Sequence, residues 1–260
     1  DIRIEDYAHF AATPRQTGDE SLAFLGIPRP GHADYPAAIK TDGNNDPRGG
    51  GHFSGRLTLP VVAAGVVAKK LLRPISIDAC IVELGGSEDP ERWDELITQA
   101  AEEGDSLGAV IECEVTGPIQ APDAGAAPLP IGLGEPFWDS VESLISHAIF
   151  SIPGVRGIEF GDGFKAAKMK GSEHNDPLDE TGPTKNGAGG VNGGLTNGAP
   201  IAFKVAFKPT SSVSKPQKTW NFTEGREDTL AIKGRHDVCF ALRCPVIVEA
   251  MTAIVLADII

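Results

Sequence analysis

Three separate stretches of this chain concentrate residue types that bind anions and move protons. RPGHADYPAAIKTDGNNDPRGGGHFSGR (29–56) combines arginines, histidines and glycines, FKPTSSVSKP (207–216) offers a lysine beside hydroxyls, and KGRHDVC (233–239) sets arginine, histidine and aspartate side by side. Cationic, hydroxyl and free amide groups bind phosphate and carboxylate oxygens, and an imidazole beside a carboxylate can exchange protons. Each stretch alone is as typical of a solvated loop or a salt-bridged turn. Together they predict a large ligand with several negative charges.

Two further segments are rich in residues that a ligand site could use. NGAGGVNGGLTNGAP (186–200) is glycine-rich, but we expect a strand after it rather than a helix, so it does not predict a dinucleotide fingerprint. It is either a loop whose backbone closely approaches a ligand or a flexible linker. GSEHND (171–176) has no second histidine or cysteine at ligand spacing, so we predict no metal site there.

The composition limits the classes of partner. The formal net charge of the 260 residues is −13 at pH 7, which argues against nucleic acid, because binding its phosphates needs an excess of lysine and arginine. No apolar run reaches the roughly 18 residues that a membrane-spanning helix needs. Cys80, Cys113, Cys239 and Cys244 show no C-x-x-C spacing, and we interpret them as free thiols in a reducing compartment. We therefore expect a cytoplasmic protein with no nucleic-acid or membrane partner.

The elements that must position these stretches are helices and strands in mixed order. Apolar spacing, early prolines and late glycines or basic residues predict helices over residues 58–73, 89–104, 135–154 and 244–260. Alternation and β-branched residues predict strands over residues 75–86, 106–120, 155–164 and 199–210. Residues 1–56 are expected to form long loops with little regular structure. Because strict β-α-β alternation is missing, the predicted fold class is α+β.

Several separated motifs resemble one known family. They are RPGHAD, GGGHFSGRLT followed by AAGVVAKKLL, GEPFWDSVESLISHAIFSIPGVRGIEFGDGF, GSEHND, GGLTNGAPI, FKPTSSVSKPQKT, and GRHDVC with PVIVEAMTAIVLAD. These motifs occur in the order of the chorismate synthase family and extend over nearly the whole chain. On these motifs the chain is identified as a member of that family.

The resemblance implies an enzyme, a carbon–oxygen lyase of the shikimate pathway that serves aromatic amino-acid biosynthesis. Family members use reduced FMN to convert 5-enolpyruvylshikimate-3-phosphate to chorismate by 1,4-anti-elimination of phosphate, without net redox change. NADPH would enter only as an external reductant of the flavin. The implied architecture is one domain over residues 1–260, a β-α-β sandwich of mixed antiparallel sheets with central helices, assembled as a homotetramer.

The family's motifs also imply roles for particular residues of this chain. His32 would donate a proton to the departing phosphate, and Asp237 would lie near flavin N5 and take its proton. The residues implied in substrate binding are Arg29, Arg48, Arg56 and Arg235. The residues implied in cofactor binding are His52, Phe53, Ser54, Pro153, Gly154, Gly193, Lys208, Pro209, Thr210, Ser211, Ser212 and Arg235.

Two departures from the family pattern leave alternatives open. Many members have Arg-Glu-Thr where this chain has Arg56, Leu57 and Thr58. Members also carry an N-terminal Gly-Glu-Ser-His-Gly segment, with a second catalytic histidine, that has no counterpart here, so we expect the chain to lack the family's N-terminal segment. One alternative is therefore an inactive, truncated form that binds FMN and phosphate ligands. Another FMN-dependent reductase is a second alternative, although no nicotinamide fingerprint is present.

Overall fold

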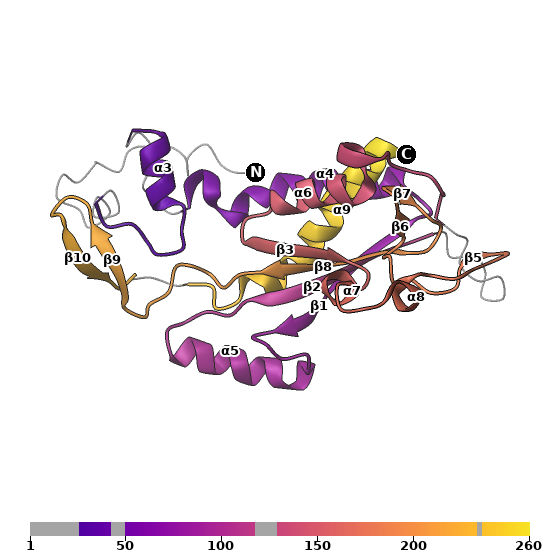
Figure 1. Ribbon diagram of the computed structural model, residues 1–260. Helices are drawn as coiled ribbons and strands as arrows, with labels where there is room; N and C mark the ends of the chain where they lie inside the picture. Colours follow the sequence, from indigo (N-terminus) through magenta and orange to yellow (C-terminus); the bar gives the residue numbers. More distant parts are fainter. Residues whose placement is uncertain (1–25, 43–49, 118–128, 233–235) are drawn as a thin grey trace.

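A four-stranded antiparallel sheet forms the centre of the protein (Figure 1). The structure is a computed structural model that describes residues 26–42, 50–117, 129–232 and 236–260. The strands are β1 (Ser76–Leu84), β2 (Ala109–Thr116), β8 (Ile201–Phe207) and β3 (Val155–Phe160), in the spatial order β1-β2-β8-β3. Each neighbouring pair is antiparallel.

Side-chain alternation explains why these segments are strands. In β8 every second residue is buried, and Phe203 and Val205 are almost fully enclosed. Successive side chains of a strand point to opposite faces, so one face of β8 belongs to the core. The same alternation in β2 buries Ile111, Cys113 and Val115 beside them.

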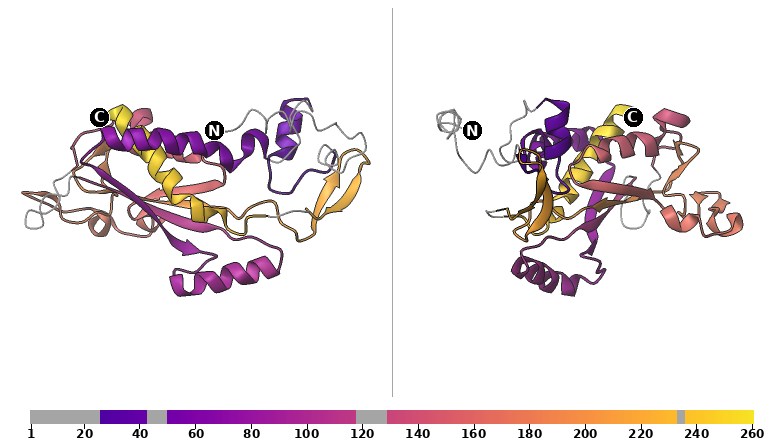
Figure 2. Two further views of the ribbon diagram at one scale, coloured as in Figure 1. Left: turned by 180° about the vertical axis from the view of Figure 1, so that it is seen from behind. Right: turned by 60° about the vertical axis from the view of Figure 1, so that its left-hand side comes forward.

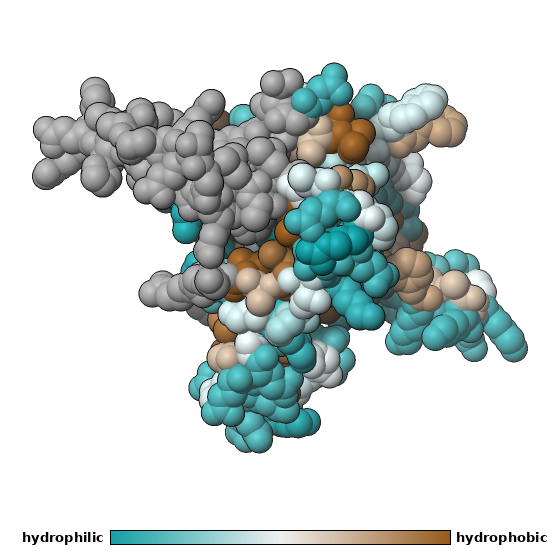
Figure 3. All heavy atoms as spheres, turned by 90° about the vertical axis from the view of Figure 1, so that its left-hand side faces the viewer, coloured by the Kyte–Doolittle hydropathy of each residue, from teal (hydrophilic) through white to brown (hydrophobic). Residues whose placement is uncertain are grey.

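Helices cover the sheet unequally. α9 (Pro245–Ile259) and α6 (Val141–Phe150) pack on one face, and α4 (Leu59–Leu71) packs against α9 (Figures 1 and 2). α5 (Trp93–Glu102) lies on the other side and presents mostly hydrophilic surface at the bottom of Figure 3. The core is therefore concentrated between the sheet, α6 and α9.

Two local features fix α4 against α9. A Cβ atom on Gly65 would lie 2.3 Å from the Cβ atom of Ala250, so only glycine allows this close approach of the helices. The ammonium of Lys69 donates to Glu249 at 2.6 Å and to the carbonyl of Ile77 at 3.0 Å, and Glu249 also accepts from the amide of Ala79. The ion pair thus joins α4, α9 and β1.

Smaller elements surround this centre. Two-stranded pairs are formed by β9 (Gln217–Asn221) with β10 (Arg226–Leu230), β4 (Leu178–Asp179) with β5 (Gly182–Pro183), and β6 (Val191–Asn192) with β7 (Leu195–Thr196). The short α-helices are α3 (Asp34–Lys40), α7 (Gly163–Ala166) and α8 (Gly171–His174). The 3-10 turns are η2 (Gly51–Phe53), η3 (Gly55–Thr58), η4 (Pro90–Arg92), η5 (Phe137–Asp139) and η6 (Phe240–Arg243).

Most sequence predictions of these elements are confirmed. The α+β class with mixed antiparallel sheets holds, and each of the eight predicted helices and strands contains an observed one. The helix predicted over 135–154 is shorter, because Ser140 caps α6 by accepting from the amide of Ser143. The loop prediction for residues 1–56 was wrong for 34–40, where α3 forms with Asp34 in its first turn. Among the described helices, none has the length and apolarity to cross a membrane.

Candidate functional site

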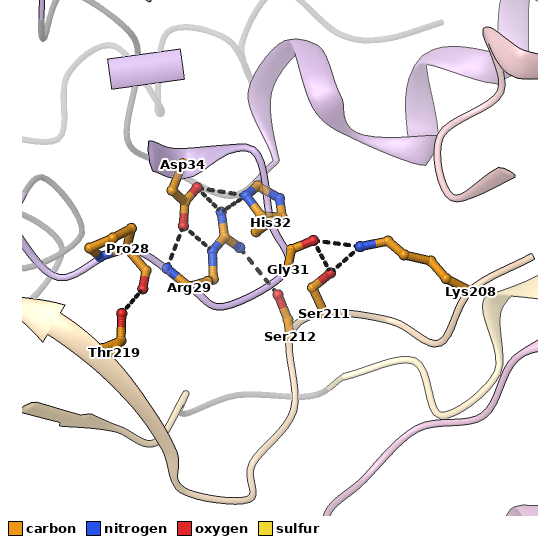
Figure 4. Close-up of polar contacts among 9 residues, drawn as sticks. All are labelled: Pro28, Arg29, Gly31, His32, Asp34, Lys208, Ser211, Ser212 and Thr219. Atoms are coloured by element: carbon orange, nitrogen blue, oxygen red, sulfur yellow. Dashed lines mark hydrogen bonds and ion pairs between the residues drawn. The ribbon is translucent and has the colours of Figure 1, made fainter. Parts of the chain in front are cut away.

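The RPGHAD segment forms a compact cluster at the start of α3 (Figure 4). Gly31 has a positive φ of 68°, which turns the chain so that Arg29 and His32 both face Asp34. The Arg29 guanidinium donates to both carboxylate oxygens of Asp34 at 2.7 Å, and the Arg29 amide donates to Oδ2 at 3.1 Å. His32 Nδ1 lies 2.6 Å from Asp34 Oδ1. Two polar residues, Arg29 and His32, are therefore held around the Asp34 carboxylate.

Two contacts of His32 Nδ1 compete with each other. The nitrogen lies 3.1 Å from an Arg29 guanidinium nitrogen and 2.6 Å from Asp34 Oδ1. Arginine can only donate and a carboxylate can only accept, so Nδ1 cannot satisfy both. The shorter contact to the charged acceptor is the stronger one, and Nδ1–H therefore donates to Asp34.

The charge of Asp34 is stabilised by these partners. Burial alone would raise its pKa, but the hydrogen bonds from Arg29 and His32 outweigh burial and hold the pKa well below the ordinary value. Arg29 and Asp34 expose only 9% and 13% of their side chains. The cluster is thus a shielded ion pair, for which breaking one partner costs more than at the surface.

The KPTSS loop that follows β8 closes against this cluster. Arg29 donates to the hydroxyl of Ser212 at 3.2 Å, and the Ser211 hydroxyl donates to the carbonyl of Gly31 at 2.7 Å. The Lys208 ammonium donates to that carbonyl and, at 2.6 Å, to Ser211 (Figure 4). Two motifs almost 180 residues apart in the sequence are therefore parts of one surface.

Positive charge gathers at this surface. The pKa of Lys208 is lowered, first by burial and then by the charge of Arg156. Arg156 lies at a β-bulge of β3, because the pairing with β8 shifts between Val155 and Gly157. The bulge brings a guanidinium near Lys208 that the sequence analysis did not single out. The sequence shows Arg156 only as a single arginine in a short predicted strand, and this pattern does not predict a β-bulge.

Two further predicted segments meet the underside of the KPTSS loop. The Lys208 amide donates to the carbonyl of Gly154 at 2.9 Å, so the Pro153–Gly154 turn lies beside the loop. A Cβ on Gly154, which has a φ of 96°, would lie 2.3 Å from the ring of Phe240. The structure thus brings residues 153–154, the KPTSS loop and η6 together.

Asp237 and His236 precede η6 in the C-terminal segment. The Arg243 guanidinium donates to Asp237 at 2.9 Å, and His236 Nε2 lies 3.0 Å from the carbonyl of Ile232. Asp237 is therefore held by a cation on η6, and within the described residues no hydrogen bond joins it to the cluster around Asp34. Arg235 lies outside the described residues.

Four other predicted residues, His52, Phe53, Ser54 and Arg56, follow the cluster in the sequence. His52, Phe53 and Arg56 are exposed, and Ser54 accepts from the amide of Arg56. Among the described residues no hydrogen bond joins them to the Arg29 cluster, and Arg48 lies outside those residues.

Gly193 is also separate. It occupies the turn between β6 and β7, at the opposite end of the sheet from α3 (Figure 1). Its φ is 61°, and open space surrounds a Cβ built on it, so a ligand could approach its backbone. Gly193 and the Arg29 cluster, both predicted to belong to the site, therefore lie at opposite ends of the sheet.

A buried hydroxyl without a hydrogen-bond partner indicates whether a flavin nucleotide fits this surface. The Thr210 hydroxyl oxygen is buried and has no hydrogen-bond partner among the residues that the structure describes, although the Thr210 carbonyl accepts from Ser106 at 2.7 Å. A buried hydroxyl without a partner is costly. With Lys208, Ser211 and Ser212 beside it, this donor set suits a phosphate or a heteroatom-rich ring, so the residues fit such a cofactor. By contrast, no cluster of three or more metal-ligating side chains occurs in the described part of the chain.

Comparison with known proteins identifies the arrangement. The model of the family described as chorismate synthase matches residues 1–260. Chorismate synthase of Chitinophaga pinensis is 56% identical over 235 residues, which cover 89% of this chain and 67% of the relative. The enzyme of Korarchaeum cryptofilum is 44% identical over 262 residues, with 89% and 70% covered. The chain thus spans about two thirds of these relatives.

A solved structure agrees with the sequence comparison. A crystal structure of chorismate synthase superimposes with a TM-score of 0.67 at 27% identity, covering 87% of this chain and 69% of the other. The family match over the full chain, the level of identity and the shared fold lead to one conclusion. The chain belongs to the chorismate synthase family, and it is a carbon–oxygen lyase.

Proposed function

We propose that this protein eliminates phosphate from 5-enolpyruvylshikimate-3-phosphate to give chorismate, with reduced FMN as its flavin. The observation that most supports this proposal is the union of RPGHAD and KPTSS, which gathers Arg29, His32 and Lys208 on an otherwise acidic protein. Substrate and cofactor together carry two phosphates and two carboxylates. Cations placed in advance stabilise such charge without reorganisation during the reaction.

His32 is the proposed proton donor. The elimination breaks the C–O bond to phosphate and a ring C–H bond and forms a C=C bond, while phosphate departs with the electron pair of the C–O bond. Because Nδ1–H is directed to Asp34, Nε2 is the nitrogen that can give a proton to the phosphate oxygen. A histidine suits this step because its unperturbed side chain titrates near neutral pH.

Arg29 and Arg56 are the proposed substrate-binding residues that the structure describes, with Arg48 and Arg235 proposed from the family pattern alone. Arg29 is largely buried and acts through its charge and its hold on Ser212. Asp237 is proposed to accept, at its carboxylate on the flavin side, the proton that the broken ring C–H bond releases, and Arg243 keeps that carboxylate in place.

The flavin is proposed to lie against the KPTSS loop. Lys208, Pro209, Thr210, Ser211 and Ser212 would hold it together with the Pro153–Gly154 turn, while His52, Phe53, Ser54, Gly193 and Arg235 are proposed from the family pattern. When bound there, reduced FMN would supply an electron that helps to expel phosphate and would recover it in the same turnover. NADPH would act only as an external reductant.

The assembly is proposed to be a homotetramer of single-domain subunits in the cytoplasm. Exposed apolar side chains on α4 support buried contacts between subunits, since Leu59 and Leu71 are 72% and 74% exposed. Light scattering on the purified protein at micromolar concentration tests the stoichiometry. A monomer at that concentration would contradict the proposed assembly without affecting the chemistry.

The decisive experiment is phosphate release from 5-enolpyruvylshikimate-3-phosphate under anaerobic conditions with dithionite-reduced FMN. We expect turnover that the His32→Ala substitution lowers by about 10²–10⁴-fold. Flavin binding without turnover would instead identify an inactive ligand-binding form. Oxidation of NADPH without phosphate release would identify a flavin reductase.

A further inference from the structure

Asp34 is the residue on which the cluster converges, yet neither its motif nor the proposed chemistry gives it a role. We infer that Asp34 is a positioning residue that fixes the His32 ring and its tautomer, so that Nε2 faces the departing phosphate. This inference rests on the proposed function of His32.

The contacts of Asp34 show why it can hold a ring in place. Its carboxylate accepts from the Arg29 amide at 3.1 Å and from the Arg29 side chain at 2.7 Å on each oxygen, and it lies 2.6 Å from His32 Nδ1. The backbone contact and the two-pronged guanidinium contact leave the carboxylate little freedom to rotate. A fixed carboxylate in turn fixes the imidazole that donates to it.

The second ring nitrogen is left for chemistry. Within the described residues, His32 makes its hydrogen bonds through Nδ1 and has no partner at Nε2. The His32 side chain is 17% exposed, so the ring is enclosed on most sides but reachable. To give a proton from Nε2, the ring must first be the imidazolium, protonated on both nitrogens. After the transfer to the phosphate oxygen the ring is neutral, with its remaining proton on Nδ1 directed to Asp34. A base or acid oriented by a third group follows the logic of catalytic triads.

The surrounding charges favour this arrangement over a purely structural ion pair. Among the described residues, the charged groups that face Asp34 are Arg29 and His32 on its own segment. Lys208 from the adjoining loop reaches the carbonyl of Gly31, which lies between Arg29 and His32 in the sequence. Arg29 alone would satisfy a structural role for the carboxylate. The 2.6 Å contact to His32 Nδ1 is the additional feature, and it is directed at the residue proposed for proton transfer.

The chain contains a matched carboxylate–imidazole pair away from this cluster. His174 Nδ1 lies 3.3 Å from Asp162 Oδ2, near the end of β3, and Asp162 is also partly buried. Asp162→Asn is therefore a suitable control for Asp34→Asn. Both substitutions remove a negative charge from a histidine partner and keep the size of the side chain.

The first measurement is histidine ¹⁵N NMR on the intact, ligand-free protein, with His32 assigned by its absence in His32→Ala. We expect the neutral His32 ring of the wild type to carry its proton on Nδ1. In Asp34→Asn the Nε2–H form should gain population, while Asp162→Asn should change the signals of His174 and leave those of His32 unaltered. An Nε2–H ring in the wild type, or a His32 signal indifferent to Asp34→Asn, would overturn the inference.

The second measurement is a double-mutant cycle on turnover. We expect Asp34→Asn to lower kcat by about 10–100-fold, the usual loss when an outer partner of a functional histidine is removed. The double variant with His32→Ala should be no slower than His32→Ala alone, because Asp34 acts through His32. Losses that multiply would show an independent role and refute the positioning role.

Two provisions keep the outcomes distinct. If Asp34→Asn fails to fold, Asp34→Glu retains the charge, and recovery of the Nδ1–H signal by that variant supports the inference whereas its loss opposes it. If the wild type releases no phosphate, the proposed function fails, while the NMR result still decides whether Asp34 sets the tautomer of His32.

Discussion

Strand β8 and the loop that follows it are held by different kinds of interaction. Along the strand, Phe203 and Val205 are enclosed by the apolar residues of α6, α9 and the neighbouring strands. Beyond its C-terminus, Lys208 and Ser211 are held by a few polar contacts to a loop from the other end of the sequence. Burial of apolar area is non-directional, whereas charge-assisted hydrogen bonds are directional. The core therefore sets stability and the loop cluster sets geometry.

This contrast predicts that mutations in the two regions affect different properties of the protein. A substitution in the loop cluster should reduce activity far more than stability, and a substitution in the sheet should do the reverse. The predictions below test that separation from the largest expected effect to the smallest.

Replacing His32 by alanine tests the loop cluster. We expect kcat for phosphate release to fall by about 10²–10⁴-fold, the usual contribution of a positioned proton donor. The melting temperature should change little, because the ring contributes little to the core. His147→Ala, at an exposed position in the last turn of α6, is the matched control and should retain full activity. Equal losses in both variants would argue against a specific role for His32.

Replacing Phe203 by alanine tests the sheet. The ring is 1% exposed and lies 5.3 Å from the ring of Phe160. Removing it should lower the free energy of unfolding by about 3–5 kcal/mol, measured by denaturant titration. Phe164→Ala, at a position 80% exposed, should change it by less than about 0.5 kcal/mol. Below its melting temperature the Phe203 variant should keep most of its kcat, and a loss as large as that of His32→Ala would contradict the separation.

The same contrast explains what the sequence could reveal. Apolar spacing predicted α4, α9 and β8 because these elements are stabilised by the burial that spacing encodes. β9 and β10 were missed, since their residues are mostly polar and the hairpin stands apart from the core.

The site was predictable in composition but not in arrangement. Motif resemblance singled out Arg29, His32 and Lys208, and the structure joins them. No local pattern shows that Ser212 meets Arg29, because their contact depends on the packing of segments far apart in the sequence. Asp34, two residues after His32, was the available signal for a histidine–carboxylate pair, but only the folded turn directs both side chains to each other.

Replacing Lys208 by methionine tests whether the loop cluster binds the cofactor's phosphate. Hydrogen bonds to charged groups contribute about 1.5–3 kcal/mol, so the Kd for FMN should rise by roughly 10–100-fold. Riboflavin lacks the phosphate, and its affinity should stay the same in the variant. Flavin fluorescence titration measures both, with Lys204→Met on β8 as the control. An equal loss of riboflavin affinity would mean that Lys208 acts on the fold of the loop instead.

The pH dependence of stability gives the smallest expected effect. The folded-state pKa of Asp34 is lowered below its ordinary value of 3.8, so the unfolded chain binds more protons there as the pH falls. The stabilisation by Asp34 is therefore complete at neutral pH and decreases as the pH falls below about 4. The free energies of unfolding of the wild type and Asp34→Asn, measured by denaturant titration, should differ most at pH 7, by about 1–2 kcal/mol. The two values should converge in acid. Asp105, Asp179 and Asp228, whose pKa values are also lowered, are common to both proteins and cancel in this difference. A gap that stays constant between pH 7 and pH 2.5 would show that the carboxylate's charge does not stabilise the loop cluster, and that its shape alone does.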